Sequence, residues 1–167
     1  VGGRPAPPLT SEPLLEAITY PFSGGAGTGT LYRPHDAGRH GAVIMMLGLN
    51  ADVQDKLLHR FAVLLSRQGV VVLVVNPLQL QSGGLSYQEV ESLVGAFRYL
   101  QVSPNVDPKR VGFAGFCVGA SLSLIAAADP RISSDVKFVN FFGGYFSARD
   151  LVAAMTTHQV RLDGDVE

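Results

Sequence analysis

The sequence predicts an α/β fold in which a mostly parallel sheet carries helices on both faces. Apolar runs of strand length alternate four times with segments that have helical periodicity or many small residues. These runs are continuously apolar rather than alternating, which is typical of strands covered on both faces. Because crossovers between parallel strands are right-handed, such a series places helices on both sides of one sheet.

An antiparallel strand pair is expected to lead into this sheet. Residues 15–22 and 28–33 have strand character, a glycine-rich turn over 24–29 joins them, and Pro34 closes the second. Proline is found at strand ends and sheet edges, so the pair is expected at one edge. The buried strands follow at 42–47, 70–75, 110–114 and 136–142, so the sheet is expected to end after about its sixth strand.

Two of the expected helices have a clear apolar face. The first spans about 53–68, and the second begins at a capping box formed by Ser86 and Glu89. A third helix, rich in small residues, spans 118–128, and a short one runs to about 155. The apolar positions that share a face are Val53, Leu57, Phe61, Leu64 and Leu65 in the first helix, and Val90, Leu93, Val94, Phe97 and Leu100 in the second.

The chain is expected to form one domain. Its 167 residues suit a single unit, and 47% of them are hydrophobic while 16% are charged, as in a protein with a buried sheet. We expect a linker over 1–14, the α/β domain over 15–155, and a tail or the start of a cap segment over 156–167. The sequence begins at Val1, so an upstream segment is expected, and the location stays open between the cytoplasm and an extracytoplasmic space.

Composition argues against several classes of partner. The net charge is -1 and no basic run is present, so nucleic acid is not an expected partner. No apolar run approaches the ~18 residues of a membrane span. The chain has one cysteine, so it cannot form an internal disulfide, and its four histidines have no metal-ligand spacing. Neither a metal nor a cofactor is therefore expected.

The most informative motif is Gly115-Phe-Cys-Val-Gly119, between the third buried strand and the third helix. It has the form G-x-C-x-G, the cysteine version of the nucleophile elbow G-x-S-x-G. The turn is tight, so the nucleophile adopts a strained backbone and the flanking residues must be small. A helix N-terminus also favours an anionic nucleophile. We therefore predict Cys117 as the nucleophile, with Gly115 and Gly119 as the elbow glycines.

Two other interpretations of this motif are weaker. Cys117 could be a buried structural cysteine, the commonest fate of a free thiol. The glycines could instead form a dinucleotide-binding loop, but their spacing is not G-x-G-x-x-G and the next strand lacks the acid that binds a ribose. The strand before, the helix after and the small flanking residues together favour the elbow.

An oxyanion hole is expected beside the elbow. One donor would be the N–H group of Val118, directly after the nucleophile, and the other would come from the loop over 48–52. Leu49 is the preferred donor in that loop and Asn50 the second choice. The same loop is also compatible with an ordinary strand-to-helix turn that has Asn50 or Asp52 as its N-cap.

Residues 111–120, with Asp107-Pro-Lys-Arg110 before them, resemble the elbow segment of dienelactone hydrolase-like α/β-hydrolases. The segments 31–34, 43–49 and 142–145 are similar to other parts of that family, and the resemblance covers about 15–155. It implies an α/β-hydrolase fold and hydrolysis of a small ester or lactone by Cys117. The oxyanion would be held by Val118 and Leu49, and an Asp and a His would assist the nucleophile.

The expected partners of the nucleophile are harder to find. In such hydrolases the acid and then the histidine follow the nucleophile in the chain. His158 is the one histidine after Cys117, so it is predicted as the base, with a solvated loop histidine as the alternative. Among the acids that follow, Asp150 is better explained as a helix cap, and Asp163 and Asp165 as parts of a turn.

The chain therefore permits two functional hypotheses. It is either an enzyme, whose remaining residues lie outside this sequence or on another chain, or a hydrolase-like binding or scaffold domain without a complete triad. Without further strands the sheet would keep an exposed edge, through which a homodimer could form.

Overall fold

The computed structural model describes residues 11–49, 52–82, 84–157, 161–162 and 165–166. Its main sheet has six strands in the order β1-β2-β4-β3-β5-β6. The strands are β1 (Leu14–Phe22), β2 (Gly25–Arg33), β3 (His40–Met46), β4 (Val70–Val75), β5 (Val106–Phe116) and β6 (Val139–Phe142). β1 and β2 pair antiparallel, β2 joins β4 antiparallel, and the remaining pairs are parallel. The predicted mostly parallel sheet with an antiparallel N-terminal pair is confirmed.

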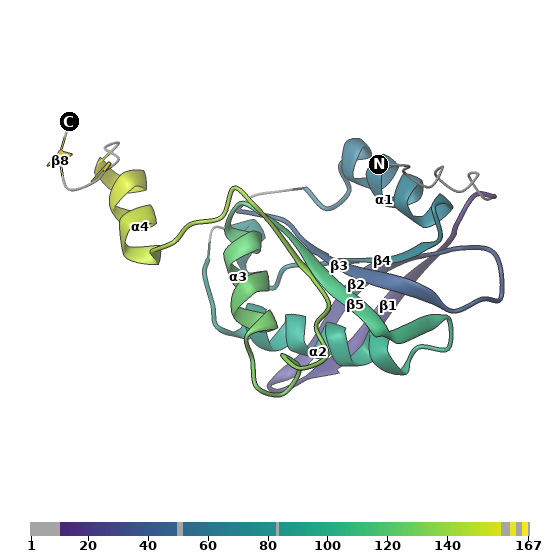
Figure 1. The fold of residues 1–167 in the computed structure, drawn as a ribbon. Helices are drawn as coiled ribbons and strands as arrows, with labels where there is room; N and C mark the ends of the chain where they lie inside the picture. Colours follow the sequence, from purple (N-terminus) through teal and green to yellow (C-terminus); the bar gives the residue numbers. More distant parts are fainter. Residues whose placement is uncertain (1–10, 50–51, 83, 158–160, 163–164, 167) are drawn as a thin grey trace, which may run out of the picture.

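Helices cover both faces of this sheet (Figure 1). Helix α1 (Lys56–Arg67) lies on one face, and α2 (Gln88–Val102) and α3 (Val118–Ala127) lie on the other. Each face has its own apolar core: Val72 and Met45 belong to the α1 side, and Phe97 and Phe113 stack with ring centroids 5.6 Å apart on the α2 side. The sheet is therefore sandwiched, as the continuously apolar strands predicted.

Helix α2 packs most closely against β1 at Gly95. A β-carbon added there would lie 2.6 Å from the Pro21 carbonyl oxygen and 2.7 Å from the Phe22 β-carbon. All five apolar positions predicted for one face of this helix are buried. The close approach explains a glycine in the middle of a helix, where it otherwise lowers stability.

The apolar face predicted for the first helix is only partly right. Leu65 and Val53 pack against the core, but Leu57, Phe61 and Leu64 are 73%, 45% and 51% exposed. The side that contacts the sheet carries Leu58, Val63 and Leu65 together with the buried residues Ala62 and Ser66. The helix also starts later than predicted, because Asp55 caps it by accepting hydrogen bonds from the N–H groups of Leu57 and Leu58. Val53 therefore lies before the helix, and the N-cap is Asp55 rather than Asn50 or Asp52.

Only the Ser86 half of the capping box predicted at Ser86 and Glu89 forms, with the Ser86 hydroxyl accepting a hydrogen bond from the Gln88 N–H at 3.2 Å. Helix α2 has Tyr87 at its N-cap position without a side-chain hydrogen bond, and Glu89 is turned inward, 1% exposed. The carboxylate of Glu89 accepts hydrogen bonds from a different segment, residues 78–80. A short 3-10 helix (η1, Leu80–Ser82) continues that segment.

The strand expected over 136–142 is shorter and more exposed than predicted. Only β6 (Val139–Phe142) is a strand, and Phe141 and Phe142 are 42% and 67% exposed. The reason is its position, because β6 is the last strand of the sheet among the described residues and has one neighbour, β5.

Beyond β6 the chain first follows α3 and then projects from the body of the domain (Figure 1), with Tyr145 and Leu151 still packed against the core on the α2 side. Helix α4 (Ala148–Thr157) extends away from the sheet, with the Ser147 hydroxyl accepting a hydrogen bond from the Asp150 N–H at its start. The short strands β7 (Arg161–Leu162) and β8 (Asp165–Val166) pair with each other, where no strand was predicted. None of the helices in the described ranges combines the length and the hydropathy that a membrane crossing requires.

Candidate active site at the end of strand β5

Cys117 forms the turn between β5 and α3 and has an unusual backbone conformation. Its φ of 54° and ψ of -130° make it the one non-glycine residue with positive φ among those the structure describes. Such a conformation costs on the order of 1–3 kcal/mol, so the surroundings must impose it. Two hydrogen bonds do so: the Cys117 N–H donates to the Phe142 carbonyl at 2.8 Å, and the Ala120 N–H donates to the Cys117 carbonyl at 2.9 Å.

The two glycines that flank the turn have no room for a side chain. A β-carbon at Gly115 would lie 2.6 Å from the Gly119 carbonyl oxygen. One at Gly119 would lie 2.5 Å from the Met46 carbonyl oxygen and would also collide with the Leu47 carbonyl. The structure thus gives a steric reason for the spacing of the motif, because α3 and β3 both press against the turn.

The loop after β3 lies directly against Cys117. A β-carbon at Gly48 would lie 2.7 Å from the Cys117 β-carbon and 3.0 Å from its Sγ atom. Leu49 follows, and its partly buried side chain packs against the core on the α2 side. The backbone at 48–49 is therefore held next to the thiol, while Asn50 lies outside the described residues.

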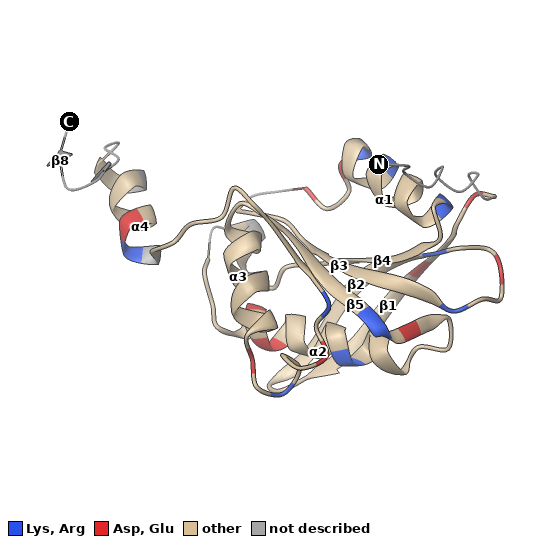
Figure 2. Cartoon of the chain, in the orientation of Figure 1, with Lys and Arg blue, Asp and Glu red and all other residues tan. Residues whose placement is uncertain are grey.

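The thiol itself is accessible and faces a helix end without charge. Cys117 is exposed, and Val118 is the first residue of α3. The first N–H groups of a helix have no partner within the helix, and the N–H of Val118, the residue after Cys117, is one of them. No charged residue occurs in α3, as Figure 2 shows, so the helix dipole is the main fixed field that the helix contributes here.

The segment after β6 closes the other side of the elbow. The Ser121 hydroxyl donates to the Tyr145 carbonyl and accepts from the Tyr145 N–H, both at 2.9 Å. The rings of Phe116 and Phe142 lie next to each other with centroids 6.1 Å apart. These contacts fix residues 142–145 against α3, and partial burial raises the pKa of the Tyr145 hydroxyl.

The described histidines lie away from the elbow. His40 begins β3, about 20 Å from the end of that strand at Met46, and its ring contacts Asp36 and the Gly69 carbonyl. His59 is on α1, and its Nδ1 lies 3.2 Å from the Tyr32 hydroxyl oxygen. His35 follows β2, which ends beside the start of β4, so His35 lies at the opposite end of the strands from Cys117.

The predicted base and acids are not brought to the elbow by any contact in the described part of the chain. His158 and Asp163 lie outside the described residues. Asp165 is in β8, and Asp150 is in the first turn of α4, where its N–H donates to the Ser147 hydroxyl that caps the helix. The described residues also contain no group of three His, Cys, Asp or Glu side chains that could hold a metal ion.

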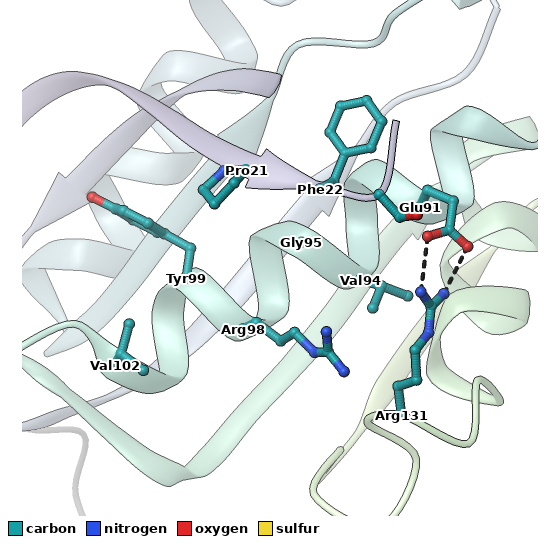
Figure 3. Close-up of a pocket in the computed structure, with 10 residues that line it drawn as sticks. Pro21, Phe22, Glu91, Val94, Gly95, Arg98, Tyr99, Val102 and Arg131 are labelled. Carbon is teal, nitrogen blue, oxygen red and sulfur yellow. Dashed lines mark hydrogen bonds and ion pairs between the residues drawn. The ribbon is translucent and has the colours of Figure 1, made fainter. Parts of the chain in front are cut away.

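A separate cavity of about 440 Å³ lies between the end of β1 and the outer side of α2 (Figure 3). Its walls include Phe22, Val94, Tyr99 and Arg98, and Cys117 is not part of its lining. Arg131 stands at its side. The cavity and the elbow are therefore separate features of the domain.

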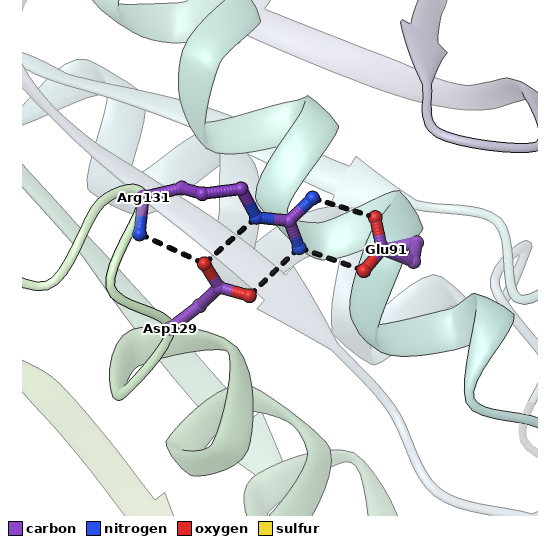
Figure 4. Close-up of polar contacts among 3 residues, drawn as sticks. All are labelled: Glu91, Asp129 and Arg131. Carbon is purple, nitrogen blue, oxygen red and sulfur yellow. Dashed lines mark hydrogen bonds and ion pairs between the residues drawn. The ribbon is translucent and has the colours of Figure 1, made fainter.

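Arg131 belongs to a network of ion pairs that joins α2 to the segment after α3 (Figure 4). Its guanidinium donates to both carboxylate oxygens of Glu91 at 2.7 and 2.9 Å, and to both of Asp129 at 2.7 and 2.8 Å. Hydrogen bonds from Arg131 lower the pKa of Asp129 to about 2 and also lower that of Glu91. Both carboxylates are thus engaged in ion pairs that connect parts of the fold.

The chain was compared with known families and proteins. Residues 79–159 match the Dienelactone hydrolase family. A thiohydrolase, apmlB of Arthrinium phaeospermum, is 32% identical over 99 residues, which are 54% of this chain and 32% of that protein. A probable 2-oxo-3-(5-oxofuran-2-ylidene)propanoate lactonase of Bradyrhizobium sp is 31% identical over 126 residues, 65% of this chain and 49% of that protein. The chain thus spans between a third and a half of the length of these curated relatives.

The fold has counterparts among solved structures. The dienelactone hydrolase from Anabaena variabilis superposes with a TM-score of 0.66 at 22% identity, over 86% of this chain and 68% of that one. At this identity the likeness supports the fold alone. Residues 79–159 and the two relatives thus show a similarity to dienelactone hydrolase-like α/β-hydrolases, as the resemblance predicted, and the fold is the one it implied.

Proposed function

We propose that this chain carries the nucleophile and oxyanion hole of a thiol-dependent hydrolase that acts on a small ester, thioester or lactone. The observation that carries the proposal is the turn at Cys117, where two backbone hydrogen bonds hold a positive φ and Gly115, Gly119 and Gly48 have no room for a side chain. A fold keeps a strained residue at an exposed strand end when its side chain has a task there. The relatives named as a thiohydrolase and a lactonase both act on acyl compounds, which supports this substrate class.

The reaction would proceed in two balanced steps. The Cys117 thiol gives its proton to a base, and Sγ attacks the carbonyl carbon to form an S–C bond. The N–H groups of Val118 and Leu49 would hold the resulting oxyanion. The C–O or C–S bond of the substrate then breaks, and its leaving group takes up the proton. Water hydrolyses the acyl-enzyme in the second step, releases the acid and regenerates the thiol.

His158 remains our proposed base in this scheme, although it lies outside the described residues. A general base contributes ~10²–10⁴-fold to such a reaction. His158→Gln should therefore reduce turnover without preventing alkylation of Cys117.

The proposal is tested by measuring hydrolysis of p-nitrophenyl acetate and of an acyl thioester by the wild type, Cys117→Ser and Cys117→Ala. We expect both variants to lose at least ~10²-fold in kcat/KM, because the nucleophile is absent or poorly activated. Mass spectrometry should detect the acyl group on Cys117 of the wild type. Esterase activity that is intact in Cys117→Ala would refute the proposal.

A second candidate is a hydrolase-like binding or scaffold domain. It is favoured by one observation, namely that the three described histidines lie away from the elbow. Under this hypothesis Cys117 would react with an activated ester no faster than a free thiol at neutral pH. The acylation rate of the wild type, compared with that of N-acetylcysteine, distinguishes the two functions.

A further inference from the structure

Glu89 is a buried carboxylate that the proposed chemistry does not use. It is the second residue of α2 and is 1% exposed. One of its oxygens accepts from the N–H groups of Gln79 at 2.7 Å and Leu80 at 3.3 Å, and the other accepts from Leu78 at 3.0 Å. Burying a charge is costly unless hydrogen bonds replace its water, and here three backbone donors do so.

The segment that Glu89 holds begins at the same end of the sheet as the elbow, namely the carboxyl ends of the parallel strands (Figure 1). Met45 of β3 pairs with Val74 of β4 on one side and with Ala114 of β5 on the other. The carboxyl ends of β4 and β5 are therefore level with each other and two strand spacings, about 10 Å, apart. Residues 78–80 follow β4, so they extend from the same end of the sheet as Cys117, which follows β5.

Hydrogen bonds fix both the N–H groups and a carbonyl group of this segment. Its N–H groups bind Glu89, and the Gln79 carbonyl accepts from the N–H groups of Ser82 and Gly84, both at 3.0 Å. Leu80 is fully buried in the core that also contains Val118. Leu78 is 36% exposed and Gln79 is exposed, so these two side chains are the ones the segment presents to solvent.

We propose that Glu89 is a positioning residue that sets which acyl groups reach Cys117. By accepting hydrogen bonds from three consecutive N–H groups, Glu89 fixes residues 78–80 in place. This segment follows β4, the thiol follows β5, and the end of β3 lies between them, so the segment would form one wall of the site. The wall limits the size of the group bound there. The statement about substrate selection rests on the proposed function, whereas the statement about access to the thiol does not.

The first test compares Glu89→Ala and Glu89→Gln with the control Glu91→Ala in hydrolysis of p-nitrophenyl acetate and octanoate. Glu91 lies on the same helix but binds Arg131, so its loss removes an acid without freeing residues 78–80. For Glu89→Ala we expect the ratio of KM for octanoate to KM for acetate to fall ~10-fold with little change in kcat, because the wall then excludes the longer acyl group less strictly. Glu89→Gln should fall between, since its amide oxygen can still accept two of the three bonds.

The second test needs no turnover. Cys117 is alkylated with iodoacetamide and with the bulkier N-phenylmaleimide, and the two rates are compared. Glu89→Ala should raise the ratio of the bulky to the small reagent at least about threefold, while Glu91→Ala leaves it unchanged.

The two tests separate the proposals. If wild-type Cys117 is not acylated but the alkylation ratio changes as expected, the proposed function fails and the positioning role stands. If esters are hydrolysed but neither selectivity nor alkylation responds to Glu89→Ala beyond the control, Glu89 is structural only and this inference is overturned.

Discussion

Gly48 and Cys117 touch where the loop after β3 meets the elbow, and a single methyl group at Gly48 would collide with the thiol. The hypothetical β-carbon lies 3.0 Å from Sγ, closer than carbon and sulfur normally approach. The glycine therefore permits the close approach of this loop to the nucleophile. A shift of about 1 Å in such a placement can cost ~10²-fold in rate.

We predict that Gly48→Ala lowers kcat/KM for p-nitrophenyl acetate by ~10²-fold, because either the thiol or the oxyanion loop must move. Steady-state kinetics measure the loss, and far-UV circular dichroism checks that the fold is retained. Gly25→Ala is the matched control, since its β-carbon would meet only the end of the Phe22 side chain at 3.3 Å. Full activity of Gly48→Ala would exclude a catalytic role for this loop.

At the scale of elements, α2 is held near its N-terminus by two acidic side chains with different partners. Glu89 ties its first turn to the segment after β4, and Glu91 ties it through Arg131 to the segment after α3. Arg131 is the shared partner of Glu91 and Asp129 (Figure 4), so their carboxylates are stabilised in the ionised form. The pKa values of both carboxyls are lowered on folding.

We predict that Arg131→Gln destabilises the protein near neutral pH and that its difference from the wild type shrinks in acid. A carboxyl with a lowered pKa stabilises the fold above its unfolded pKa and loses that contribution as pH falls through its folded pKa. For Asp129 this window runs from 3.8 down to about 2. Urea unfolding at pH 7 and at pH 2.5 measures the difference.

The matched control for this prediction is Arg98→Gln. Arg98 lies on α2 near both carboxylates, and its loss also removes one positive charge. Arg98 acts on them through space, with Arg131 supplying the hydrogen bonds, so its loss should matter less. An equal destabilisation by Arg131→Gln at both pH values would mean that the ion pairs contribute nothing and that only packing was lost.

At the scale of the whole molecule, the described sheet has two very different edges. β1 ends one side and is braced by α2, whereas β6 ends the other with Phe138, Phe141 and Phe142 all more than 40% exposed. An unpaired apolar edge of this kind favours pairing with another chain. The expected homodimer through this edge therefore stays a prediction with a defined surface.

We predict that the chain self-associates with rising concentration and that Phe138→Lys weakens this association, because a charge at an edge opposes strand pairing. Sedimentation velocity over a range of concentrations measures it. Phe61→Lys on α1 is the control, since Phe61 has the same 45% exposure as Phe138. A wild type that stays monomeric, or two variants that behave alike, would contradict the prediction.

The sequence by itself determined the order of the elements and the position of the elbow. Both are local properties: continuous apolar runs reveal strands that are covered on both faces, and a tight strand-to-helix turn demands small residues at fixed spacing. For the same reason Gly115, Cys117 and Gly119 could be singled out without any knowledge of their neighbours. The resemblance to dienelactone hydrolase-like proteins rested on the same residues.

Only the tertiary structure decided what lies around these elements. Leu57 and Phe61 have helical spacing, but the side of α1 that meets the sheet is the one that carries Leu58, Ala62 and Leu65. Glu89 matched a capping box, yet the segment at 78–80 offered it three N–H donors that no sequence pattern reveals. Burial and partner choice depend on residues far apart in the chain, so they follow from how the sheet and helices come together.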